Sequence, residues 1–142
     1  MQSNMIFTYS ICDPLEKEII SISKNFKGEE LLQIAKNYPW MEKLNIMEQL
    51  KPEEIYYNPS LDFLNVISKS SFGLSAHFND QQELEFSLWY RRPKKNNVFF
   101  GLFGEKEKMV VDDKWGYNLE ASLIYLNDFI DGNDEKLEQL FI

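Results

Sequence analysis

The stretch "SFGLSAHFNDQQELEFSLWY", residues 71–90, decides the fold class because apolar side chains recur at every second position on both sides of a polar tetrapeptide. A period of two is typical of a β-strand that buries one of its faces. Two such runs around residues 79–82 predict an antiparallel hairpin. The positions expected to face the core are Phe72, Leu74, Ala76, Phe78, Leu84, Phe86, Leu88 and Tyr90.

The following residues, "NNVFFGLFGEKEKMVVDD" (96–113), contain two more strand-like runs, with a turn expected at residues 104–106. We therefore predict an antiparallel meander of about four strands over residues 71–112.

The segments on either side of the meander predict helices. Asp13, Pro14 and Glu16 have the spacing of a helix start, which predicts a helix over residues 14–26. Further helices are expected after Gly28, between the prolines at 39 and 52, from the cap Asn118 to the stop at Gly132, and over residues 133–142. Residues 59–69 fit either a helix or a strand, and we favour a helix.

Helices before and after an antiparallel sheet indicate an α+β fold with the helices packed on one sheet face. At 142 residues, with 44% hydrophobic residues, the chain has the size and core material of a single domain over 1–142. We find no internal repeat, and no linker long enough to divide the chain.

The cysteine content and the N-terminus bear on localisation. Cys12 has no second cysteine to pair with, which fits a reducing compartment. The N-terminus lacks the basic region of a signal peptide, and no segment has the roughly 20 apolar residues that cross a bilayer. We therefore expect a cytoplasmic protein without a membrane contact.

Few residues suggest catalysis or cofactor binding. His77 is the single histidine, expected on the polar face of its strand, and a hydrolase or transferase would need it together with carboxylates. Neither a Gly-x-Ser-x-Gly elbow nor a glycine-rich phosphate loop is present. The acidic residues from 128 to 134 do not fit a calcium loop, since with Gly132 at the sixth position Phe129 would occupy a ligand position. We predict no metal and no cofactor.

The basic run Arg91, Arg92, Lys94 and Lys95 follows Trp89 in a chain of net charge −8. This charge disfavours nucleic acid, and the RNA-recognition signature is not matched. The run is either a solvated hairpin, kept from pairing by its cations and Pro93, or part of a contact surface. The predicted partner-binding residues are Trp89, Arg91, Arg92, Lys94, Asp112, Asp113, Asp128, Asp131 and Asp134.

A small acidic α+β domain that is rich in aromatic residues and lacks a catalytic motif resembles the immunity proteins that bacteria make against polymorphic or contact-dependent toxins. The resemblance implies a protein that binds and neutralises one cognate toxin, and the acidic clusters would suit a basic toxin domain. The alternatives are an adaptor subunit of a bacterial complex and the small hydrolase or transferase that uses His77.

Overall fold

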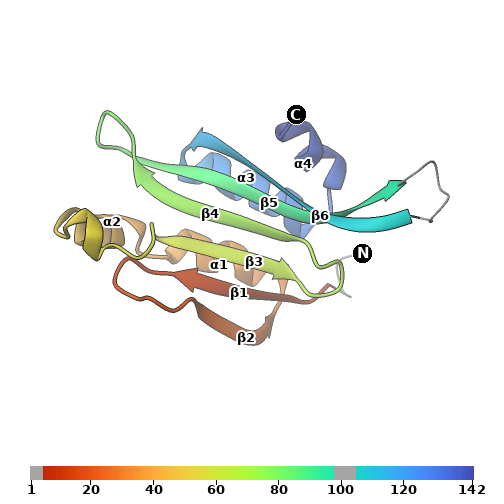
Figure 1. Ribbon diagram of the computed structural model, residues 1–142, viewed down its shortest axis with the longest axis horizontal. Coiled ribbons are helices and arrows are strands. Elements are labelled where there is room, and N and C mark those ends of the chain that lie inside the picture. Colours follow the sequence, from red (N-terminus) through yellow and green to blue (C-terminus); the bar gives the residue numbers. More distant parts are fainter. Residues whose placement is uncertain (1–4, 98–104) are drawn as a thin grey trace.

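The computed structural model describes residues 5–97 and 105–142, and over these residues the chain forms one six-stranded antiparallel sheet with the order β2-β1-β3-β4-β5-β6 (Figure 1). The predicted α+β class is confirmed. The strands are β1 (Phe7–Cys12), β2 (Ile20–Phe26), β3 (Ser60–Asn65), β4 (Ser71–Phe78), β5 (Leu84–Asn97) and β6 (Glu105–Tyr117). The helices are α1 (Gly28–Asn37), α2 (Trp40–Glu48), the 3-10 turn η1 (Pro52–Glu54), α3 (Leu119–Ile130) and α4 (Asp134–Leu140).

The helices lie on one face of the sheet, and the core fills the space between the two layers (Figure 1). Phe72 of β4 stacks on Phe129 of α3 with ring centroids 5.8 Å apart, and Trp40 of α2 meets the ring of Phe86 edge to face. The predicted core positions of residues 71–90 are all buried or packed against the core. Within the described part of the chain no helix covers the opposite face, which we call the open face (Figure 1).

The predicted helix over residues 14–26 is wrong, because its start signals form a turn. The Asp13 carboxylate accepts the backbone N–H of Leu15 at 2.9 Å, and Asp13 also pairs with Lys43 of α2 at 2.6 Å. After this turn the β-branched sequence "ISISKNF" forms edge strand β2, which pairs with β1, a strand that the sequence analysis did not predict.

The helix favoured for residues 59–69 is also wrong, since this segment contains strand β3. Leu61 and Phe63 are buried while Asp62 and Leu64 are exposed, which is the alternation of a strand with one buried face. The segment pairs with β1 on one side and with β4 on the other, so both of its edges are hydrogen-bonded. The sequence alone allowed either a helix or a strand here, and the hydrogen bonding of both edges favours the strand.

Where four meander strands were predicted, the described part of residues 71–112 contains three, because β5 continues through the basic run to Asn97. Glu105 and Lys106 belong to β6 and pair with Asn97 and Asn96, so the turn predicted at residues 104–106 is misplaced. The extra predicted strand falls largely on residues 98–104, outside the described residues. The predicted polar turn at 79–82 is confirmed, with the Asn79 side chain accepting the N–H of Gln81.

The other helix predictions are confirmed. Asn118 caps α3 by accepting the N–H of Ala121 at 2.8 Å, and Gly132 follows that helix with the positive φ of 73° that the predicted stop requires. None of the described helices has the length and apolar character needed to cross a membrane.

Candidate functional site

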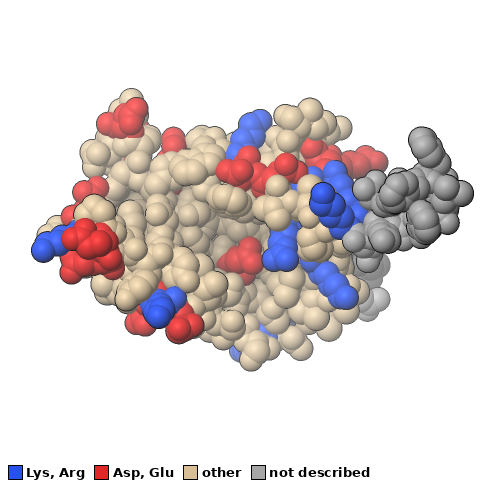
Figure 2. Space-filling view, in the orientation of Figure 1, with Lys and Arg blue, Asp and Glu red and all other residues tan. Residues whose placement is uncertain are grey.

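The open face forms a groove that crosses the sheet. Three adjoining hollows share the side chain of Asp62, and together they extend from Trp115 on β6 to Ser21 on β2. The first hollow has a volume of about 440 Å³. Figure 2 shows this face hollowed across its middle, with acidic atoms on the floor and basic side chains towards one end.

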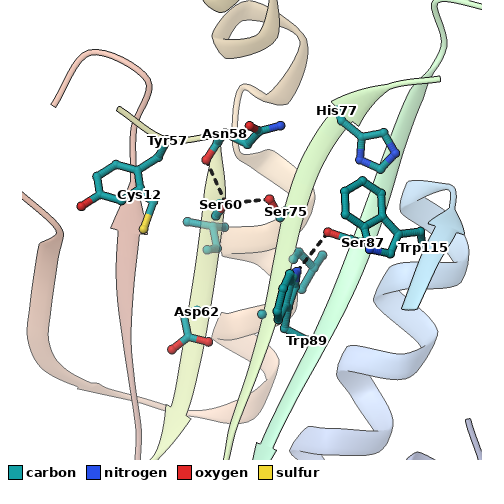
Figure 3. Close-up of a pocket in the computed structure, with 13 residues that line it drawn as sticks. Cys12, Tyr57, Asn58, Ser60, Asp62, Ser75, His77, Ser87, Trp89 and Trp115 are labelled. Carbon is teal, nitrogen blue, oxygen red and sulfur yellow. Dashed lines mark hydrogen bonds between the residues drawn. The ribbon is translucent and has the colours of Figure 1, made fainter. Parts of the chain in front are cut away.

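In one row of residues across the groove, a glycine leaves one position without a side chain. Asp62, Gly73, Trp89 and Asp113 lie in direct register on β3, β4, β5 and β6. A Cβ at Gly73 would lie 3.1 Å from Oδ1 of Asp62 and 3.6 Å from Cβ of Trp89. The missing side chain therefore leaves a slot between an acidic and an aromatic residue, which lie on either side of β4 (Figure 3).

The Asp62 carboxylate has no partner in the described part of the chain: neither a hydrogen bond nor an ion pair holds it there. Although its side chain is reached by solvent, the surrounding walls of the groove desolvate it and raise its pKa, an effect that the positive charge of Arg91 partly offsets. An ionisable group that is partly desolvated and unpaired is available for an incoming cation.

Two tryptophans remain exposed in the hollow that this carboxylate lines. Trp89 is 40% exposed and donates its indole N–H to the hydroxyl of Ser87 at 3.0 Å. Trp115 is 61% exposed and donates to Asp113 at 2.8 Å. A bulge at Gly116, where φ is 100°, shifts the register between β5 and β6 next to Trp115. Trp89 is not among the positions predicted to face the core, and its exposure agrees with that alternation.

A second row along the groove carries small polar side chains, from Cys12 on β1 through Ser60 and Ser75 to Ser87. The Ser60 hydroxyl donates to that of Ser75 at 2.9 Å. Burial raises the pKa of the Cys12 thiol, and the charge of Asp62 raises it further. The neutral thiol is therefore favoured, which opposes a nucleophilic role for Cys12.

His77 lines the same pocket, at the end where β4 and β5 join. Its Nε2 lies 2.8 Å from a carboxylate oxygen of Glu85, and its ring lies 4.9 Å from that of Trp115. Cys12 lies two strands away, with backbones about 12 Å apart, and Figure 3 shows the two side chains on opposite sides of the pocket. Across residues 5–97 and 105–142, no hydrogen bond joins His77 to a serine or a cysteine.

The described side chains of the basic run, those of Arg91, Arg92 and Lys94, do not form one cationic patch, because neighbouring residues of a strand point to opposite faces. Arg91 lines the groove, whereas Arg92 is 5% exposed on the helical side. Arg92 pairs with Glu138 of α4 at 2.6 Å and with Asp112 at 2.7 Å, and its guanidinium stacks on the Tyr90 ring at 4.6 Å. Lys94 also contacts Glu138, at 2.9 Å. Arg92 is thereby used to attach α4 to the sheet.

The acidic residues predicted to contact a partner are also divided between the groove side and the helical side of the sheet. Asp113 lies at the rim of the groove, whereas Asp128, Asp131 and Asp134 belong to the helical layer. There Asp134 accepts the hydroxyl of Tyr90 at 3.2 Å, Asp128 lies 4.0 Å from Lys136, and Asp131 accepts from Asn127 at 3.2 Å.

The structure thus brings together Trp89, Arg91 and Asp113 of the predicted set. Sequence reasoning missed Asp62, Gly73 and Trp115. The alternation in "SLDFLN" was the signal that places Asp62 on the polar face of a strand.

No group of three or more His, Cys, Asp or Glu side chains among the described residues is arranged to hold a metal ion. Comparisons with protein-family models, with curated proteins and with solved structures found no match to this chain.

Proposed function

We propose that this protein is a non-enzymatic binding domain of the immunity type, which neutralises a basic toxin domain by holding it on the open face of the sheet. The observation that carries the proposal is the groove around Asp62, where this carboxylate, which has no partner among the described residues, lines the same hollow as two exposed indoles. Tryptophan is the residue most enriched among the side chains that dominate binding energies.

The shape and the charge of the groove favour a protein over a small ligand. The three hollows are open and adjoin one another across the sheet, as suits an extended or convex protein surface rather than an enclosed metabolite. The net charge of −8 attracts a basic partner and repels acidic ones. An adaptor subunit would use the same face and would differ from an immunity protein in the consequence of binding.

The test is affinity capture from the source cells with three forms of the tagged protein. The wild type and the Ile124→Ala variant should retain the same partner, and the Trp89→Ala variant should lose it. Ile124 is the matched control because it is a large apolar residue, 59% exposed, on α3 in the helical layer. Equal capture by all three forms would contradict a binding role for the open face.

The inhibitory role needs a second measurement. The captured protein is expressed in susceptible cells, with and without the wild-type binding domain. We expect the partner alone to stop growth, the wild-type domain to restore it, and Trp89→Ala to fail. A partner that binds but is harmless to cells would support the adaptor role and contradict the immunity role.

A small hydrolase or transferase is the second candidate, favoured by His77, which lines the pocket and lies 2.8 Å from Glu85. Such a pair can act as a general base when a water or a substrate hydroxyl lies within reach of the free ring nitrogen. The purified protein is assayed against ester and phosphoester substrates, and the enzyme hypothesis requires a turnover that His77→Ala abolishes. A turnover that His77→Ala leaves intact, or none at all, would contradict it.

A further inference from the structure

From the slot between Asp62 and Trp89, we infer that the open face recognises an arginine side chain of the partner protein, with its guanidinium stacked on the indole and paired with the carboxylate. This inference rests on the proposed function, because it names the chemical group that the groove receives. It adds a specific contact to a surface that was so far defined by exposure and charge.

The dimensions of the slot suit one planar cation. Asp62 and Trp89 are two strands apart, so their backbones are separated by about 10 Å, and Gly73 between them has no side chain. Figure 3 shows the Trp89 indole nearly edge-on, so that a ring face is turned towards the β3 side of the slot. Its hydrogen bond to Ser87 fixes this orientation.

The chemistry of the two walls selects a guanidinium over other groups. An arginine side chain can stack its plane on an aromatic face while its N–H groups donate to a carboxylate, two contacts that use different parts of the same group. Lysine offers a compact charge that cannot stack in this way. An uncharged planar group such as a urea would stack but would leave the Asp62 carboxylate without a counter-ion.

The protein's own cations leave the slot open. Arg91 lines the groove beyond Ser71 and lowers the pKa of Asp62 through its charge, yet it forms no ion pair with Asp62 in the described part of the chain. Arg92, the neighbouring guanidinium, is committed to Glu138 and Asp112 on the helical side. Among the described residues, the Asp62 carboxylate thus has no cation of the protein itself as an ion-pair partner.

The experiment titrates the whole protein with three capped amino acids: N-acetyl-arginine methylamide, the corresponding citrulline compound and the lysine compound. Binding is followed by the NMR shifts of the backbone amides of residues 62, 73 and 89. We expect saturable shifts with the arginine probe, with millimolar affinity, and affinities at least five-fold weaker for citrulline and lysine. No saturable shift with arginine, or equal shifts with citrulline, would overturn the inference.

Two variants distinguish binding in the slot from a general attraction between the acidic protein and the cationic probe. Asp62→Asn should weaken the arginine probe at least ten-fold, and it should fold because its carboxylate accepts no hydrogen bond from the described residues. Gly73→Ala should weaken the probe by narrowing the slot, because the new Cβ would touch Asp62 Oδ1. The surface variant Asp131→Asn on the helical layer should bind as the wild type does. Equal weakening by Asp131→Asn and Asp62→Asn would show nonspecific attraction and overturn the slot.

The outcomes for the slot and for the proposed function are distinguishable. If the arginine probe does not bind but capture of the partner still depends on Trp89, the inferred arginine slot is contradicted and the open face remains the proposed binding surface. If the probe binds with the expected selectivity while no Trp89-dependent partner is captured, the slot stands and the proposed function is wrong.

Discussion

Among the described side chains of the basic run, Arg92 has the most internal ionic contacts, and its role is to hold α4 against the sheet. Its side chain is buried, whereas its partners Glu138 and Asp112 are partly exposed. Desolvation opposes the charge of Arg92, but the hydrogen bonds that its guanidinium donates to Glu138 and Asp112, with their negative charges, outweigh it and raise the pKa of the guanidinium. Removing either Arg92 or its carboxylate partners should therefore lower the stability of the folded protein.

We predict that Arg92→Met lowers the free energy of unfolding by about 3 kcal/mol, because it removes the cation of Asp112 and leaves Glu138 with Lys94 alone. Arg91→Met is the matched control, one residue away but exposed in the groove, and it should change stability by less than about 0.5 kcal/mol. Urea unfolding followed by circular dichroism measures both. Equal losses in the two variants would contradict the different roles of the two arginines.

The same contacts predict an acid dependence of stability. Hydrogen bonds from Arg92 hold the pKa of Glu138 below its ordinary value. A depressed pKa in the folded state stabilises the protein above the unfolded value of about 4.3, and this stabilisation is lost as the pH falls through the folded pKa. Glu138→Gln should therefore be less stable than the wild type at pH 7, and the difference should shrink towards pH 3. A difference that is constant from pH 7 to pH 3 would contradict this assignment.

Arg91 provides a further test of the slot, because its charge acts on the Asp62 carboxylate, which the arginine probe would also contact. Removing it by Arg91→Ala should strengthen binding of N-acetyl-arginine methylamide about two- to five-fold at low salt, since like charges in one groove repel. The gain should disappear at about 0.5 M salt, where screening is strong. Weaker binding by Arg91→Ala would mean that Arg91 contacts the probe directly.

At the scale of elements, α1 and α3 approach each other closely at Gly28. A Cβ at this position would overlap Cγ2 of Ile130, a residue of the core. Gly28→Ala should lower the free energy of unfolding by about 2 kcal/mol through overpacking, although alanine favours helices more than glycine does. Glu29→Ala, at the adjacent exposed position, should cost less than about 0.5 kcal/mol. A stabilised Gly28→Ala protein would show that the two helices can separate without cost.

The elements that could be predicted from sequence are those whose periodicity is unambiguous. Leu74 to Phe78 and Leu84 to Tyr90 alternate over long runs, and α3 has both a cap at Asn118 and a stop at Gly132. Strand β2 could not be predicted, because Asp13 and Pro14 serve a turn and a helix start equally well. Pairing with β1, a long-range contact, decided the outcome.

For the candidate site, the predictable part was the exposure of Trp89, which follows from alternation along β5. The slot could not be predicted, because it needs the register of three strands, and the register of β3 depends on recognising it as a strand. The separation of Arg91 from Arg92 could not be predicted for a related reason: it requires that β5 continues past Tyr90, where its alternation sends the two residues to opposite faces.

At the scale of the whole molecule, the net charge of −8 predicts electrostatically steered association with a basic partner. The association rate with the captured partner should fall at least ten-fold between about 0.05 and 0.5 M salt, while the dissociation rate changes much less. Stopped-flow mixing at a series of salt concentrations measures both rates. An association rate that is indifferent to salt would contradict the role of the acidic charge.

The central claim is that the partner binds the open face of the sheet, and isothermal titration calorimetry of the purified partner tests it most directly. The affinity of Trp89→Ala is compared with that of Ile124→Ala, which alters the helical layer. We predict a loss of about 30-fold or more for Trp89→Ala, the effect of removing a binding hot spot of about 2 kcal/mol, and less than two-fold for Ile124→Ala. Equal affinities for the two variants, or a larger loss for Ile124→Ala, would contradict the claim.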